Sequence, residues 1–153
     1  MRHIIGFGNA LHGDDGFGPE VCRRLAALPG ATGLRIFDAA TRGLDALPLF
    51  AGCSEAVVID AAAPGAEPGK ITEWSPAGLL EEAHEDGLHG GGLRYLLRAL
   101  QSQDAALPRI RIVTAEAQSI TRFQPGLSDP MRAAVDETVR HLKLWLDTVE
   151  TQP

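Results

Sequence analysis

The chain has little of what directs a protein to membranes, nucleic acids or disulfide formation. Its two cysteines, Cys22 and Cys53, lack Cys-x-x-Cys or metal-ligand spacing, which predicts reduced thiols in the cytoplasm. No apolar run approaches the roughly 18 residues that span a bilayer, and the chain enters a strand-like segment without a signal peptide. With 14 basic against 20 acidic residues, the net charge of −6 leaves no basic surface for nucleic acid. We therefore expect a cytoplasmic protein, without membrane or nucleic-acid partners.

Length and composition favour a single domain over residues 1–153, because 44% hydrophobic residues can bury one core. The pattern alternates strand and helix, which predicts an α/β three-layer sandwich: a mostly parallel sheet of about five strands with helices on both faces. The expected strands are 3–7, 34–38, 56–60, 70–74 and 109–114. The expected helices are 19–27, 44–50, 93–100 and a last one that begins after Ser128, with a polar, glycine-rich segment over 75–92.

A glycine-rich turn with two adjacent carboxylates lies near the N-terminus. The sequence IIGFGNALHGDDGFG, residues 4–18, is typical of a strand, a turn and a helix start. Such corners build the sites of open α/β sheets. A phosphate-binding loop would present bare backbone N–H groups, whereas Asp14 and Asp15 bring negative charge. The turn therefore indicates a cation site or acid–base chemistry.

Two other interpretations of this turn remain open. The two aspartates are also residue types that form turns and helix caps. A nucleotide-binding module would use Gly6 and Gly8 for pyrophosphate and Asp38 for ribose, although Leu11 stands where that fingerprint has its third glycine.

Further aspartates follow apolar segments. Asp38 ends the second expected strand and Asp60 the third, and the carboxyl ends of parallel strands share one edge of a sheet. A nitrogen ligand would extend such a site from hard cations to nickel or zinc. His89, which precedes three glycines, is the first candidate, and His12 and His84 are alternatives.

Five motifs in order resemble the maturation endopeptidases of nickel–iron hydrogenases, peptidase family M52. Each motif alone is modest, but their order and spacing along nearly the whole chain make a specific signal. They are Gly8–Gly18, similar to the family's G-N-x-L-x-x-D-[DE]-G-x-G; Asp38–Leu44, similar to D-G-G-T-x-G-x; Val57–Ala61; His89–Leu93; and Gln118–Ser128, which ends in P-x-L-S.

The resemblance implies removal of a C-terminal extension from the hydrogenase large-subunit precursor after nickel insertion. It places the metal-binding residues at Asp15, Asp60 and His89, with nickel arriving on the substrate and no organic cofactor. We assign catalysis to Asp15 and Asp38, and expect a monomer. Substrate recognition is expected from Thr41, Arg42 and Gly43.

The chain departs from the family pattern at three of these places. Asp15 stands where many relatives carry glutamate, and Ala39–Ala40 replaces a glycine pair. Glycines follow His89 where many relatives have H-Q-x-G-L. Two mechanisms stay open. Either the metal activates the carbonyl or a water, with Asp38 or Asp14 as base, or it is a recognition handle and Asp38 acts directly. The other function considered is a non-catalytic nickel chaperone that docks on the large subunit.

Overall fold

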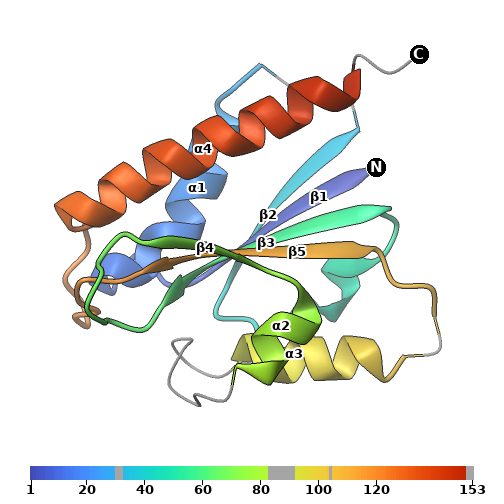
Figure 1. Ribbon diagram of the computed structural model, residues 1–153, viewed down its shortest axis with the longest axis horizontal. Helices are drawn as coiled ribbons and strands as arrows, with labels where there is room; N and C mark the ends of the chain where they lie inside the picture. Colours follow the sequence, from blue (N-terminus) through green and yellow to red (C-terminus); the bar gives the residue numbers. More distant parts are fainter. Residues whose placement is uncertain (30–32, 83–91, 104, 151–153) are drawn as a thin grey trace.

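The computed structural model describes residues 1–29, 33–82, 92–103 and 105–150, which form one five-stranded sheet (Figure 1). The strands lie in the order β2-β1-β3-β5-β4, and all neighbours are parallel except β4, which runs antiparallel to β5. Their bounds are β1 Arg2–Phe7, β2 Leu34–Ala40, β3 Glu55–Ala62, β4 Ile71–Trp74 and β5 Arg109–Glu116. The predicted mostly parallel sheet is confirmed.

Helices cover both faces of this sheet, as predicted (Figure 1). One face carries α1 (Phe17–Ala26) and α4 (Asp129–Glu150), and the other carries α2 (Pro76–Glu81), α3 (Gly92–Gln101) and the 3₁₀ helix η2 (Leu44–Phe50). A second 3₁₀ helix, η1 (Gly13–Gly16), connects β1 to α1. No helix within the described ranges is long and apolar enough to cross a membrane.

The central strand β3 decides which way the site residues face. Val57 and Ile59 pack into the core beneath α1 and α4, whereas Val58 packs into the core beneath α3. Because side chains alternate along a strand, Asp60 shares the α3 side with Val58. The unbroken apolar run of β3 is explained by helices on both of its faces.

The helix α2 was not predicted and corrects the expectation of a loop over its residues. Ser75 caps it, since its hydroxyl oxygen accepts a hydrogen bond from the Gly78 N–H at 3.0 Å, and Pro76 occupies the first turn. Leu79 is the buried residue of this helix. A helix this short shows no apolar period in the sequence, so only its cap residues could have indicated it.

Gly18 sits where α1 crosses β1 with no space for a side chain. A β-carbon at this position would overlap the Phe7 carbonyl oxygen and lie 2.8 Å from the Ile59 carbonyl oxygen. We expect Gly18→Ala to lower the free energy of unfolding by about 1–3 kcal/mol, because backbone atoms on two strands would have to move. Gly43→Ala is the control, since no atom lies within 4 Å of its added β-carbon. Equal urea midpoints for the two variants would contradict this packing.

Candidate active site

A pocket of ≈390 Å³ opens at the carboxyl edge of the sheet, on the α3 side. Five of the residues predicted from the sequence to form the site line it together: Asp15, Thr41, Arg42, Gly43 and Asp60. The other lining residues come from four places, namely the end of β1 with the turn after it, the end of β2, the start of α3 and the segment before α4. They are Phe7, Gly8, Asn9, His12, Ala40, Gly92, Leu93, Ile120, Arg122 and Phe123.

Asp15 is fixed at the end of β1 by the turn that precedes it. Its carboxylate oxygen Oδ2 accepts a hydrogen bond from the Asn9 backbone N–H at 2.9 Å. Gly8 makes this turn possible, because its φ of +127° suits only glycine and an added β-carbon would overlap the Asp15 carbonyl oxygen. The glycine of the first motif therefore serves to bring Asp15 into the pocket.

Asp60 projects from β3 beside Asp15, and both carboxylates are buried, with 4% and 5% of their surface exposed. Burial raises the pKa of Asp60 well above its ordinary range, and the Asp15 charge raises it further, against a smaller opposing effect of the Ala61 backbone N–H. Neither carboxylate forms an ion pair with a described residue. Two buried carboxylates without a basic partner fit a cation, which would relieve both the repulsion and the burial penalty.

The third ligand predicted from the sequence, His89, lies outside the described residues, as does the alternative His84. Among the residues that the structure describes, no three histidine, cysteine or acidic side chains are grouped closely enough to hold a metal ion. The ligand set of Asp15, Asp60 and His89 therefore stays a prediction, of which the first two residues share the pocket.

The segment before α4 lines the pocket with Ile120, which belongs to the fifth motif, and with Arg122 and Phe123, to which the sequence analysis gave no role. It is tied to the first turn, since the Phe123 N–H donates to His12 Nδ1 at 3.0 Å and the Gly13 N–H donates to the Gln124 carbonyl at 2.9 Å. The available signal was its place after β5, because loops at the carboxyl ends of parallel strands line such sites.

Asp14 turns away from the pocket and holds this part of the chain together. Only 1% of its surface is exposed, and its carboxylate accepts four hydrogen bonds. The donors are the backbone N–H groups of Gln118 at 2.8 Å, Ser119 at 3.2 Å and Ser128 at 2.7 Å, and the Ser128 hydroxyl at 2.8 Å. The cap and turn role considered for this residue describes it better than the role of a base.

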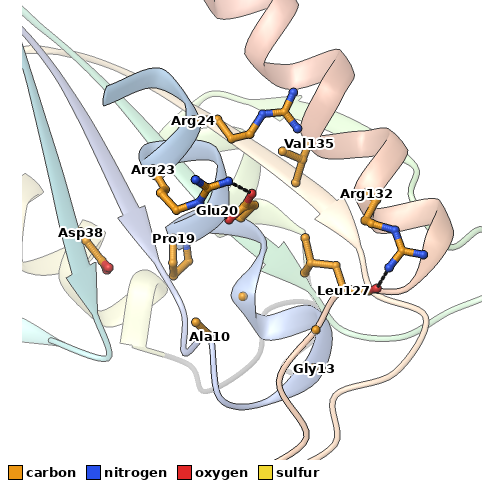
Figure 2. Close-up of a pocket in the computed structure, with 12 residues that line it drawn as sticks. Ala10, Gly13, Pro19, Glu20, Arg23, Arg24, Asp38, Leu127, Arg132 and Val135 are labelled. Atoms are coloured by element: carbon orange, nitrogen blue, oxygen red, sulfur yellow. Dashed lines mark hydrogen bonds and ion pairs between the residues drawn. The ribbon is translucent and has the colours of Figure 1, made fainter. Parts of the chain in front are cut away.

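Asp38 lies on the other face of the sheet, in a separate cavity of ≈590 Å³ between β2, α1 and α4. Figure 2 shows it near Pro19 and the Glu20–Arg23 ion pair of α1, with Leu127 and Arg132 across the cavity. The aspartates thus share the carboxyl edge of the sheet, as expected, but Asp38 does not line the pocket of the other two. The catalytic role expected for it stays a prediction, and its place outside that pocket favours a positioning role instead.

Asp38 is connected to the first pocket through the turn after β2. Its Oδ1 accepts a hydrogen bond from the Ala40 N–H at 2.9 Å, and the Ala40 carbonyl accepts one from the Gly8 N–H at 2.9 Å. Ala40 has a φ of +49°, in the left-handed region where alanine is strained. Asp38 therefore stabilises the strained turn that leads into Thr41, Arg42 and Gly43.

Three other residues, Cys22, His3 and Gly6, have structural roles. Cys22 is buried in the core, and burial and the nearby Asp38 charge raise its pKa to about 12. His3 is buried in β1, where its Nδ1 hydrogen-bonds the Leu49 carbonyl at 2.8 Å. The Gly6 position packs against the Gly18 carbonyl, so the Gly-x-Gly pattern is used for packing and for the Asp15 turn. These contacts give the nucleotide-binding interpretation no support.

Sequence comparisons give one family. The profile of HycI, hydrogenase maturation protease, matches residues 19–143. The chain is 27% identical to the hydrogenase expression/formation protein HupD of Rhodobacter capsulatus, over 93% of this chain and 71% of that protein. It is also 27% identical to a putative hydrogenase maturation protease of Methanocaldococcus jannaschii, over 89% of this chain and 90% of that protein.

Solved structures show the same fold. The [NiFe] hydrogenase maturation protease HycI of Thermococcus kodakarensis superposes with a TM-score of 0.78 at 22% identity, covering 95% of this chain and 92% of the other. The hydrogenase maturating endopeptidase HybD of E. coli gives a TM-score of 0.74 at 19% identity, covering 97% and 93%. Together with the profile match, these findings show that the chain belongs to the hydrogenase maturation protease family and is an endopeptidase.

Proposed function

We propose that this endopeptidase removes the C-terminal extension of a [NiFe]-hydrogenase large-subunit precursor after nickel insertion. The observation that carries the proposal is the pair of buried carboxylates, Asp15 and Asp60, in one pocket without a basic partner among the described residues. We further place the enzyme in the cytoplasm, in keeping with its free cysteines Cys22 and Cys53, and expect it to act as a monomer.

Nickel enters this proposal as part of the substrate. Asp15 and Asp60 would supply two oxygen ligands and His89 an imidazole nitrogen, a mixed set that suits nickel better than a hard cation. Such a set leaves coordination positions for the groups with which the precursor holds its metal. A precursor without nickel would leave the two carboxylates unpaired, so the site can distinguish loaded from unloaded substrate.

Each residue of the pocket has a task in this scheme. The Asn9 N–H fixes Asp15, so that its free oxygen is available to the cation. Asp60, whose pKa is raised, holds its proton more readily than an ordinary aspartate until a cation approaches. Thr41, Arg42 and Gly43 form the wall that would contact the extended segment to be cut.

Substitutions of Asp38 test whether the motif Asp38–Leu44 takes part in the reaction or only positions the substrate-binding turn. Because its oxygen holds the Ala40 turn, we expect Asp38→Asn, which keeps that acceptor, to cleave at a rate near that of the wild type. Asp38→Ala should raise the KM for precursor by about tenfold, the effect of losing one charge-assisted hydrogen bond. Steady-state cleavage kinetics separate the roles, because a base at Asp38 predicts instead that Asp38→Asn slows kcat by roughly 10²–10⁴-fold.

The proposed function is tested with purified precursor in three parallel incubations. Nickel-loaded precursor, nickel-free precursor and loaded precursor without enzyme are incubated and separated by gel electrophoresis. We expect a smaller product only in the incubation that contains both the nickel-loaded precursor and the enzyme. Binding of loaded precursor without any size change would support the nickel-chaperone interpretation, and equal cleavage of both precursors would remove nickel recognition from the proposal.

A further inference from the structure

The rim of the Asp15–Asp60 pocket carries positive charge that no ion pair within the described ranges neutralises. Arg42, from the turn after β2, and Arg122, from the segment before α4, both line the pocket and are exposed. Neither forms an ion pair with any residue in the described part of the chain. Four arginines elsewhere have acidic partners, namely Arg23, Arg24, Arg111 and Arg132. Arg42 and Arg122 differ from the remaining exposed arginines because both line this pocket.

His12 adds a third donor to this rim. Its Nδ1 accepts the Phe123 N–H at 3.0 Å, which leaves Nε2 as the donor atom of the ring. The Phe123 ring packs edge-on against the imidazole with centroids 5.1 Å apart, and Phe123 has a φ of +56°, which is uncommon for a side chain of this size. The ring is therefore held at its Nδ1 edge, and no residue that the structure describes forms a hydrogen bond with Nε2, so this edge is left for a ligand.

The pocket is thus divided by charge. Its buried acidic side chains are Asp15 and Asp60, which form the floor, and its basic side chains are His12, Arg42 and Arg122, which form the more exposed rim. We propose that the rim binds a carboxylate of the precursor while the floor binds its cation. This inference rests on the proposed function and adds a chemical class to its substrate: a segment that presents a carboxylate next to the bound metal.

Charge balance supports this assignment. The chain carries a net charge of −6 and would repel an acidic segment over most of its surface. Guanidinium groups bind carboxylates through paired hydrogen bonds, so two of them at one rim give a defined place for such a segment. The carboxylate has two possible sources, an acidic side chain near the cut or the new C-terminus that the cut creates.

The test compares the double variant Arg42→Gln/Arg122→Gln with Arg140→Gln, a control on the exposed side of α4. Binding of uncut nickel-loaded precursor and its cleavage are both measured at low and high salt. We expect the double variant to raise Kd and KM at least about tenfold at low salt, with kcat little changed and with less salt dependence than the wild type. Equal Kd and KM for the double variant and the control would overturn the proposal.

Two further arms identify the source of the carboxylate. If it is a side chain, replacing acidic residues near the cut by their amides should remove the difference between wild type and double variant. If it is the new C-terminus, a product peptide with a free carboxylate should inhibit the wild type more strongly than the same peptide as its amide. The absence of both effects would overturn the proposal.

The role of His12 is tested with two substitutions, each of which retains one of the two hydrogen-bonding positions of the imidazole ring. Asparagine reaches the Nδ1 position, so His12→Asn keeps an acceptor for the Phe123 N–H and loses the rim donor. Glutamine reaches the Nε2 position, so His12→Gln keeps the donor. We expect a higher KM for His12→Asn and a lower Tm for His12→Gln. An unchanged KM for His12→Asn, with a raised KM for His12→Gln, would make His12 a support for the Phe123 segment and remove it from the rim. The wild-type reaction in the same assay reports on the proposed function, and the precursor-binding data test the rim without cleavage.

Discussion

Asp60→Asn is expected to make the metal-free protein more stable and its cleavage of loaded precursor at least about 10²-fold slower. The two effects have one cause. Asp60 is buried beside Asp15, so its charge opposes folding until a cation arrives, and asparagine removes that charge together with the ligand. We expect a gain of about 0.5–2 kcal/mol in the free energy of unfolding, the usual size of such replacements at a functional site.

The gain in the free energy of unfolding of Asp60→Asn over the wild type should increase as pH rises. The pKa of Asp60 is raised in the folded state, so above the ordinary aspartate range the folded protein binds more protons than the unfolded chain. The stability of the wild type therefore falls as pH rises through this window, and that loss is absent in Asp60→Asn. Thermal unfolding in the presence of a chelator, from about pH 4 to about pH 8, measures the difference. Asp45→Asn, an exposed site, is the control, and a wild type more stable than Asp60→Asn across this range would contradict the account.

Asp14→Ala is expected to lower the free energy of unfolding by about 3–5 kcal/mol, the largest loss of stability that we predict. Four donors from the segment before α4 would lose their acceptor. Ser128→Ala removes only one of these hydrogen bonds and should cost about 1 kcal/mol. Urea unfolding of both variants gives the comparison.

These variants would also distinguish the structural role of Asp14 from the functional role of Asp15. Asp14→Ala should unfold more easily and its pocket should lose the position of Arg122 and Phe123, whereas Asp15→Asn should keep its stability and lose activity. An Asp14→Ala protein as stable as the wild type would show that the segment before α4 is held by other contacts.

The fold could be predicted from the sequence because its strands are apolar runs between turn residues. The run of β3 is apolar on both faces, and this required helices on both sides of the sheet. The short helix α2 and the 3₁₀ turn of Gly13–Gly16 were not predicted, because neither is long enough to show a period.

The sequence predicted at which edge of the sheet the site aspartates lie, but not on which face of the sheet each side chain lies. Asp38 and Asp60 both follow apolar strands, so their place near the carboxyl edge was visible in the sequence. The face was not, because both sides of β2 and β3 are apolar and the alternation gives no preferred direction. The contribution of Arg122 and Phe123 depends on the contact of their segment with His12, which is far away in sequence.

The most direct test of the central claim is to locate nickel in the protein itself. Crystals soaked with Ni²⁺ and measured at its absorption edge would give an anomalous peak at the bound ion. The account predicts one strong peak in the pocket, about 2–2.3 Å from carboxylate oxygens of Asp15 and Asp60 and from a His89 ring nitrogen. A peak bound by other residues, with Asp15 and Asp60 left free, would contradict it.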